Sequence, residues 1–154
     1  MKKLLFVVVA VFTMFCVAGC GGGSSFGSKQ SSNVQTQAQK EKTYAEANIN
    51  QLLKEAQENA AKANKTYKGK DVKIVGGAIQ NIDSDVKYIT VDSASAGLME
   101  YGMMSVHCDI KGEKLKDKVL EFKKEQPVII YGKIKEVGDL MGYTMVLEKI
   151  EAVK

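Results

Sequence analysis

Few residues in this chain of 154 are of a type that could bind a metal or attack a substrate. The single histidine, His107, is followed by Cys108, and Met103 and Met104 lie just before them, which makes a set of soft ligands such as copper prefers. Adjacent side chains of a strand point to opposite faces, so His107 and Cys108 cannot share an ion. Met103 and His107 share a face but lie about 13 Å apart. We therefore expect no metal site and a Cys108 that is buried in the core.

A short acidic segment has the spacing of the first ligands of a calcium-binding loop, with Asn81, Asp83 and Asp85 at alternate positions. Such a loop needs glycine at its sixth position and glutamate at its twelfth. Those positions hold Val86 and Asp92. The segment therefore predicts a hairpin turn and no calcium site.

No nucleophile and base are placed to act together. Cys108 is expected to face away from His107, and Ser93, Ser95 and Ser105 stand in none of the sequence contexts of catalytic serines. All 22 basic residues are lysines, so no arginine could stabilise a phosphoryl transition state. We expect a protein that is not an enzyme and that holds no cofactor.

Outward aromatic and polar side chains are a better candidate, since they could bind a ligand without changing it. In one alternating pattern Ile89 and Val91 face the core, which leaves Tyr88 and Thr90 facing outward. Rings on such a face could stack on a ligand. The predicted ligand-binding face consists of Tyr88, Thr90, Tyr101, His107 and Lys133. The alternative is that these side chains only cover the surface of the domain.

The charge balance bears on which ligand such a face could bind. Lys73, Lys87 and Lys133 could contact phosphate groups, but from Lys68 to the end of the chain 14 lysines are matched by 14 acids. Affinity for nucleic acid rises with the number of phosphates that a protein neutralises. A neutral domain without arginine is therefore not expected to bind nucleic acid.

Five strand patterns and one helix after Lys68 must position these residues. The strand patterns are centred on Val72 to Ile79, Ile89 to Val91, Met104 to Ile110, Val128 to Ile134 and Tyr143 to Val153, and the helix spans Lys114 to Lys124. In the first strand the apolar alternation changes phase at Gly76 and Gly77, which predicts a bulge. The order β-β-β-α-β-β predicts a mainly β domain over residues 68–154, a five-stranded OB-fold barrel. An open α+β sheet is the alternative.

An amphipathic helix is predicted before this domain, over residues 43–67. Thr43 and Glu46 have the spacing of a capping box, and Gly69 follows the last turn. The apolar positions recur at helical spacing at Ile49, Leu52, Leu53, Ala56, Ala60, Ala63 and Tyr67. Strong heptads are absent, so we expect the helix to pack on the following domain and to form no coiled coil.

The start of the chain predicts export. Lys2 and Lys3 precede an apolar run of fourteen residues, Leu4 to Val17, which is too short to cross a bilayer comfortably, so residues 1–19 are expected to be a signal peptide. The sequence Val-Ala-Gly-Cys ending at Cys20 resembles a bacterial lipobox, which implies a diacylglycerol, with fatty acids such as palmitate, on the Cys20 thiol. An uncleaved anchor helix is the alternative. Residues 20–42 are rich in glycine, serine and glutamine and predict a flexible tether.

Short motifs in the domain resemble the tRNA_anti-like family of bacterial OB-fold proteins, many of which are predicted lipoproteins. The motifs are residues 64–70 leading into Val72–Gly76, then Val128–Ile134, and the closing strand from Tyr143. The resemblance spans roughly residues 52–153 and implies the OB-fold. At residues 125–127 the chain has Glu-Gln-Pro where such proteins more often have a Lys-Gly-Asp or Lys-Gly-Gln turn. The family name implies a distant likeness to anticodon-binding domains and no particular activity.

These features predict a lipid-anchored protein on the periplasmic or extracellular face of a bacterial cell envelope, with a non-catalytic binding module. The expected ligand is a protein or an envelope glycan, and a monomer is favoured. Methionines and leucines in the loops that flank the barrel could add an adaptable apolar surface. These residues are Leu98, Met99, Met103, Met104, Leu140 and Met141. One alternative is a protein that binds single-stranded nucleic acid, and another is an assembly element that self-associates through its helix.

Overall fold

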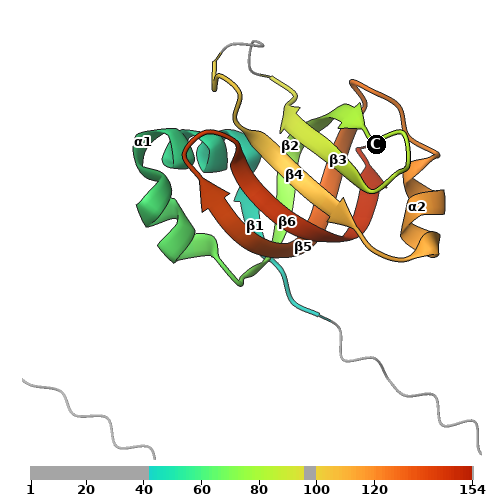
Figure 1. Cartoon of the computed structure of the whole chain (residues 1–154), viewed down its shortest axis with the longest axis horizontal. Coiled ribbons are helices and arrows are strands. Elements are labelled where there is room, and N and C mark those ends of the chain that lie inside the picture. Colours follow the sequence, from blue (N-terminus) through green and yellow to red (C-terminus); the bar gives the residue numbers. More distant parts are fainter. Residues whose placement is uncertain (1–41, 96–99, 154) are drawn as a thin grey trace, which may run out of the picture. The chain divides into compact units, whose positions relative to one another are not determined.

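The computed structural model describes residues 42–95 and 100–153. The predicted signal peptide, Cys20 as the predicted site of lipid attachment and nearly all of the predicted tether lie outside the described residues, as do Leu98 and Met99. The elements in chain order are β1 (Ala45–Asn48), α1 (Ile49–Tyr67), β2 (Asp71–Ile82), β3 (Tyr88–Ser93), β4 (Ser105–Ile110), α2 (Glu113–Val119), β5 (Pro127–Gly138) and β6 (Gly142–Ala152) (Figure 1). Residues 40–154 form one compact unit.

Five of the strands close into a barrel, as predicted for an OB-fold. The sheet order is β1-β2-β3-β4-β6-β5, and β2 also pairs with β5, which closes the ring. The two ends of β2 have different neighbours, because Asp71–Ala78 pair with β5 and Gly77–Ile82 with β3. The open-sheet alternative is therefore wrong.

The predicted bulge in β2 is confirmed at its two glycines. The register with β5 shifts between Ile74 and Gly77, and Gly76 has a φ of +81°, which a side chain would disfavour. A Cβ on Gly77 would lie 2.5 Å from Cγ1 of Val91. The bend lets one strand pair along both sides of the barrel.

The core follows the alternation predicted from the sequence. Ile89 and Val91 are fully buried, while Tyr88 and Thr90, which alternate with them along β3, are half-buried on the outer surface. Cys108 is 0% exposed, and this burial raises the pKa of its thiol. The largest side chains of the core are Tyr143, Ile49, Leu52, Leu53, Ile74, Ile79, Ile89, Ile130, Ile134, Met145, Leu147 and Val72.

The first helix starts later than predicted. Residues Ala45–Asn48 form β1, which pairs in parallel with β2, and α1 begins at Ile49. The N-cap is Asn48, whose side-chain oxygen accepts a hydrogen bond of 2.9 Å from the backbone N–H of Asn50. The predicted capping box at Thr43 and Glu46 is wrong, because Glu46 lies within β1, opposite Lys73 of β2, and the helix begins only at Ile49.

The prediction that the helix docks on the barrel is confirmed. The buried face of α1 contacts β5, β6 and β2. At Asn59 the helix is kinked, with a φ of −163° and a ψ of 87°, and the Asn59 side chain accepts a hydrogen bond from the N–H of Lys62 and caps the second half. The buried residues of α1 are Ile49, Leu52, Leu53, Ala56 and Ala63. Within the described residues no helix is long and apolar enough to span a bilayer.

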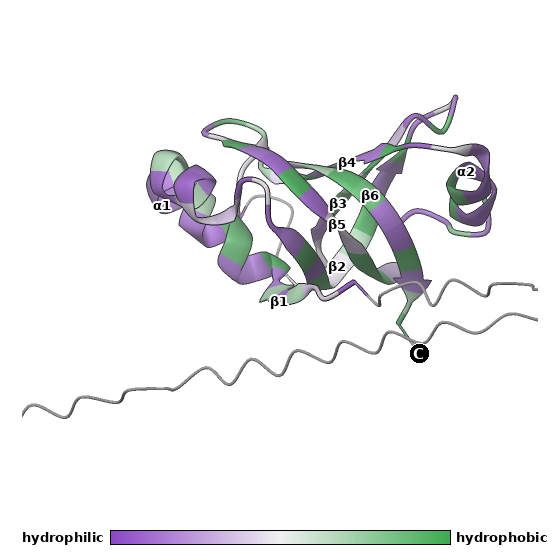
Figure 2. Cartoon of the chain, turned by 90° about the horizontal axis from the view of Figure 1, so that it is seen from below, coloured by the Kyte–Doolittle hydropathy of each residue, from purple (hydrophilic) through white to green (hydrophobic). Residues whose placement is uncertain are grey.

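The second helix is shorter than the predicted range of Lys114 to Lys124. It ends at Val119, and Leu120, the next residue, is 65% exposed. The chain then turns through Glu125, which has a φ of +65° and whose N–H donates to the carbonyl of Ile79 at 2.7 Å. Figure 2 shows α1 and α2 at opposite sides of the barrel.

Candidate functional site

The outer surface of β3 and β4 brings together three of the five predicted ligand-binding residues. Thr90 lies opposite His107 in the register between these strands, and Tyr88 lies opposite Asp109. The rings of Tyr88 and His107 are 4.5 Å apart between centroids and tilted by 32°. Tyr88, Thr90 and His107, together with Asp92 at the next outward position of β3, form what we call the β3 face.

The other two predicted residues lie elsewhere. Tyr101 is in the turn before β4, half-buried against the core, and partial burial and the neighbouring Glu100 raise the pKa of its hydroxyl. Lys133 is on β5, and its Nζ lies 3.9 Å from Oδ1 of Asp71 on β2. β5 pairs with β2 and β6 and with neither β3 nor β4, so Lys133 does not lie on the strands that carry Tyr88 and His107. Both residues are therefore removed from the β3 face.

The lysines around the barrel that could contact phosphate are close to acids. Nζ of Lys87 lies 2.6 Å from Asp85, and Nζ of Lys73 lies 2.7 Å from Glu46. The hydrogen bond to Asp85 raises the pKa of Lys87. These pairs neutralise the positive charge that a nucleic-acid ligand would require.

Next to the stacked rings, Asp109 forms a polar cluster with its neighbours. Its Oδ2 accepts a hydrogen bond of 2.9 Å from Nζ of Lys135, and its Oδ1 lies 3.4 Å from Nε2 of His107. The hydrogen bond to Asp109 raises the pKa of Lys135. Asp109 thus holds Lys135 beside the β3 face and neutralises the positive charge of this lysine.

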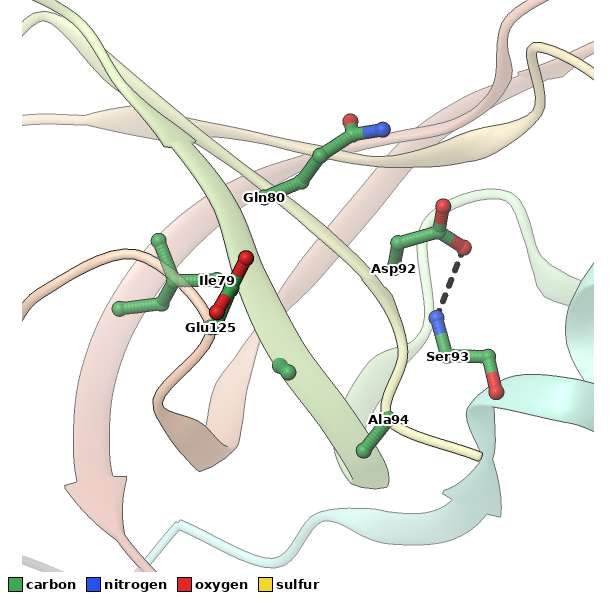
Figure 3. A pocket seen from close by; sticks show the side chains of 7 residues that line it. Ile79, Gln80, Asp92, Ser93, Ala94 and Glu125 are labelled. Atoms are coloured by element: carbon green, nitrogen blue, oxygen red, sulfur yellow. Dashed lines mark hydrogen bonds between the residues drawn. The ribbon is translucent and has the colours of Figure 1, made fainter. Parts of the chain in front are cut away.

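A hollow of about 200 Å³ continues the β3 face at the far end of β3. Its lining residues are Ala78, Ile79, Gln80, Asp92, Ser93, Ala94 and Glu125 (Figure 3). Ala78 pairs with Asp92 across β2 and β3, and its short side chain leaves the space open. Oδ1 of Asp92 accepts a hydrogen bond of 2.7 Å from the N–H of Ser93, and Glu125 enters from the loop before β5.

The lining of the hollow predicts which groups it can receive. Two carboxylates, one amide and one hydroxyl surround a small apolar floor, and no lysine lines it. Carboxylates accept hydrogen bonds and attract cations, so an ammonium or guanidinium group fits this hollow and a phosphate does not. Sequence reasoning missed it because Asp92 and Glu125 come from distant segments. The outward position of Asp92, in phase with Tyr88 and Thr90, was the one available signal.

An exposed apolar cluster lies beside the start of β4. Met103, Leu140 and Met141 are 66%, 60% and 58% exposed, and the N–H of Ser105 donates to the carbonyl of Met141, which joins the two loops. Met103 and His107 are four residues apart, so in an extended chain their side chains point to the same, outer side. Of the methionines predicted to form an adaptable surface, Met104 is instead buried.

The two metal-like patterns in the sequence have structural explanations. Oδ2 of Asp83 accepts hydrogen bonds from the N–H groups of Asp85 and Lys87, so the acidic segment forms the predicted hairpin turn. Cys108 is buried on the opposite side of β4 from His107. Across residues 42–95 and 100–153 no three histidine, cysteine or acidic side chains are grouped so that they could hold a metal ion.

The sequence pattern that defines the tRNA_anti-like family matches residues 1–150. The chain belongs to the tRNA_anti-like family. This family is an OB-fold family related to anticodon-binding domains, and the barrel described above has that fold. No curated protein matches the chain in sequence.

Solved structures that resemble this tRNA_anti-like protein are OB-fold proteins of several kinds. Asparaginyl-tRNA synthetase of Entamoeba histolytica is 19% identical with a TM-score of 0.40, and the match covers 56% of this chain and 21% of the synthetase. The mitochondrial single-stranded DNA binding protein Rim1 of S. cerevisiae is 16% identical with a TM-score of 0.41, over 56% and 94%. OBody AM1L10, bound to hen egg-white lysozyme, is 17% identical with a TM-score of 0.41, over 62% and 88%.

These likenesses concern the fold alone. The tRNA_anti-like chain matches only about a fifth of the length of the synthetase, and the catalytic part of the synthetase has no counterpart in the chain. The family is an OB-fold binding domain, typically without catalytic activity.

Proposed function

We propose that this tRNA_anti-like protein is a non-catalytic binding module, anchored to the bacterial cell envelope through a lipid on Cys20, which receives a basic segment of a partner protein on its β3 face. The observation that carries the proposal is the acidic hollow between Asp92 and Glu125, at the end of that face. A cation close to a carboxylate at a protein surface gains about 4 kcal/mol of Coulomb energy before desolvation is subtracted.

The surroundings of the hollow favour a protein ligand over a glycan. The exposed side chains of Met103, Leu140 and Met141 add apolar surface beside the start of β4. Methionine is flexible and polarisable, so it adapts to apolar side chains of a partner. A segment with one lysine or arginine for the hollow and apolar residues beside it matches both features.

The anchor rests on the leader and on the four residues that end at Cys20. A lipid with two or three acyl chains gives stable attachment, and the tether would let the domain reach partners near the membrane. Mass spectrometry of the mature amino terminus tests this: the expected product begins at an acylated Cys20. An intact Met1 or an unmodified Cys20 would contradict the anchor and leave the binding proposal standing.

Single-stranded nucleic acid is the second candidate ligand, and one observation favours it. The stacked rings of Tyr88 and His107 lie on the two strands whose outer surface OB-folds use to bind oligonucleotides. We rank it second because Lys73, Lys87 and Lys135 are paired with acids.

Fluorescence anisotropy on residues 42–154 separates the two candidates. We expect a labelled lysine-rich peptide to bind, and a glutamate-rich peptide of equal length and an oligothymidylate not to bind. Replacing both hollow carboxylates (Asp92→Asn with Glu125→Gln) should weaken binding at least about tenfold, since one hydrogen bond to a charged group contributes about 1.5 kcal/mol or more.

The matched control removes two acids from α2, far from the hollow (Glu113→Gln with Asp117→Asn). An equal loss of affinity in this control would show that only net charge matters and would overturn the proposed site. Tight binding of oligothymidylate with a steep salt dependence, lost in Tyr88→Ala, would establish the second candidate instead. Binding of soluble envelope glycan in preference to the peptide would overturn the choice of a protein ligand.

A further inference from the structure

The helix α2 lies on the side of the barrel opposite α1 (Figure 2). It is part of a basic surface with an exposed leucine, and these exposed side chains belong neither to the core nor to the β3 face. This surface consists of α2 and the segments next to it, residues 111–124, and we call it the α2 surface. Leu120 at its tip is 65% exposed. The lysines of this surface are Lys111, Lys114, Lys116, Lys118, Lys123 and Lys124.

The charge of the domain is concentrated on this surface. Residues 42–153 contain 17 lysines and 17 acids, so the domain as a whole is neutral. Residues 111–124 contain six lysines and three acids, which gives this surface a net charge of +3 and leaves −3 on the remainder. Potential at a surface depends on local charge, so a neutral domain can still present one strongly basic side.

Most of this positive charge is not neutralised by ion pairs. Lys116 pairs with Glu113 and Lys118 pairs with Glu121, both within α2 and its last turn. Across the part of the chain that the structure describes, no ion pair joins Lys111, Lys114, Lys123 or Lys124 to an acid. Four ammonium groups therefore remain available to an external anion.

The exposed leucine shows which kind of anion fits. Val119 is buried and Leu115 and Phe122 pack against the core, but Leu120 points away from it, with Lys116 four residues before and Lys123 and Lys124 just after. An apolar side chain surrounded by lysines is typical of protein segments that lie on anionic membranes, with the apolar group between the headgroups and the lysines at their level. A polyphosphate chain would gain nothing from the leucine.

We propose that the α2 surface binds the surface of a membrane that contains anionic lipids. This contact is separate from the lipid on Cys20 and from the β3 face, so it does not require either of them. Combined with an acyl anchor, it would hold the domain against the bilayer by its α2 side and leave the acidic hollow to a partner.

Co-sedimentation of residues 42–154, which form one compact unit and lack the predicted anchor, tests the proposal. The vesicles are phosphatidylcholine alone or phosphatidylcholine mixed with phosphatidylglycerol. We expect binding only to the mixed vesicles, with salt weakening it. A lysine near an anionic membrane contributes about fivefold in partitioning, so Lys123→Gln with Lys124→Gln should lower binding about 25-fold. Leu120→Ser should lower it about threefold or more.

Matched controls separate this surface from general charge or apolarity. Lys62→Gln with Lys65→Gln removes two lysines from α1, on the other side of the barrel, and Val153→Ser removes another exposed apolar side chain, outside both surfaces. Both should bind within twofold of the unaltered protein. Equal losses in these controls, equal binding to phosphatidylcholine alone, or no binding to the mixed vesicles would overturn the proposal. Because no peptide is present, these outcomes are independent of the β3-face experiment.

Discussion

The strands β5 and β6 approach each other so closely at Gly132 that a single added methyl group should disrupt their pairing. A Cβ added at Gly132 would lie 2.1 Å from the carbonyl oxygen of Val146 and 2.6 Å from Cε of Met145, whereas ordinary contact begins at 3.4 Å. The Val146 oxygen belongs to the backbone of the paired strand and cannot move without moving that strand, whereas Cε is the end of the flexible Met145 side chain. Gly132→Ala therefore forces β5 and β6 apart by about 1 Å.

Overpacking of this kind typically costs 1–3 kcal/mol, and the 2.1 Å approach to a backbone oxygen places Gly132→Ala at the upper end, at about 3 kcal/mol. For a domain of this size the melting temperature should fall by about 12 °C or more. Because the chain has no tryptophan, circular dichroism is the appropriate measure of unfolding.

Gly138→Ala on the same strand is the matched control, since its Cβ would approach no atom closer than 3.9 Å. It should change stability by less than about 0.5 kcal/mol or raise it slightly. If the two variants unfold at the same temperature, β5 and β6 do not approach each other at Gly132 as described, and this account of their pairing is wrong.

Three further predictions concern single residues. Glu125→Gly should raise stability by up to about 1 kcal/mol, because glycine adopts the left-handed backbone conformation of this position without strain. The same change should weaken binding of the lysine-rich peptide. Unfolding and fluorescence anisotropy on one sample test the two expectations. Leu53→Ala, on the buried face of α1, should cost about 3 kcal/mol, and a loss below about 1 kcal/mol in urea unfolding would contradict docking of the helix. The hydrogen bond from Lys149, and to a smaller degree that from Tyr131, lowers the pKa of Glu151 from its usual 4.5. The ionised Glu151 therefore stabilises the fold above pH 4.5, and this stabilisation is lost as the pH falls through the lowered pKa. When the free energy of unfolding is measured against pH, the Glu151→Gln variant should lack this loss of stability in acid. A profile equal to that of the unaltered protein would show that the hydrogen bonds of Glu151 do not stabilise the fold.

Much of the barrel was predictable because strand faces follow a local rule. Ile89 and Val91 are buried and Tyr88 and Thr90 face outward, as the alternation required. The phase change at Gly76 correctly indicated the bend in β2. The resemblance to the tRNA_anti-like family identified the fold before any pairing of strands was known.

The errors occurred where a distant segment outweighed a local preference. Thr43 and Glu46 have the spacing of a helix cap, but the residues that follow pair with β2 instead. The lysine-rich segment after Lys114 has helical periodicity to Lys124, but the chain turns after Val119 because Glu125 hydrogen-bonds to Ile79. Neither partner can be identified from the neighbouring sequence.

The sequence by itself therefore determined which side chains of each strand face the core, that the domain is neutral, and that a lipid-modified start is to be expected. Only the tertiary structure decided that Tyr88 stacks on His107, that Lys133 lies beside Asp71 on a strand paired with neither β3 nor β4, and that Asp92 and Glu125 share one hollow. The reason is that alternation depends on neighbouring residues of one strand, whereas the composition of a site depends on which strands pair and in what register. In a barrel that register is determined jointly by all of its strands.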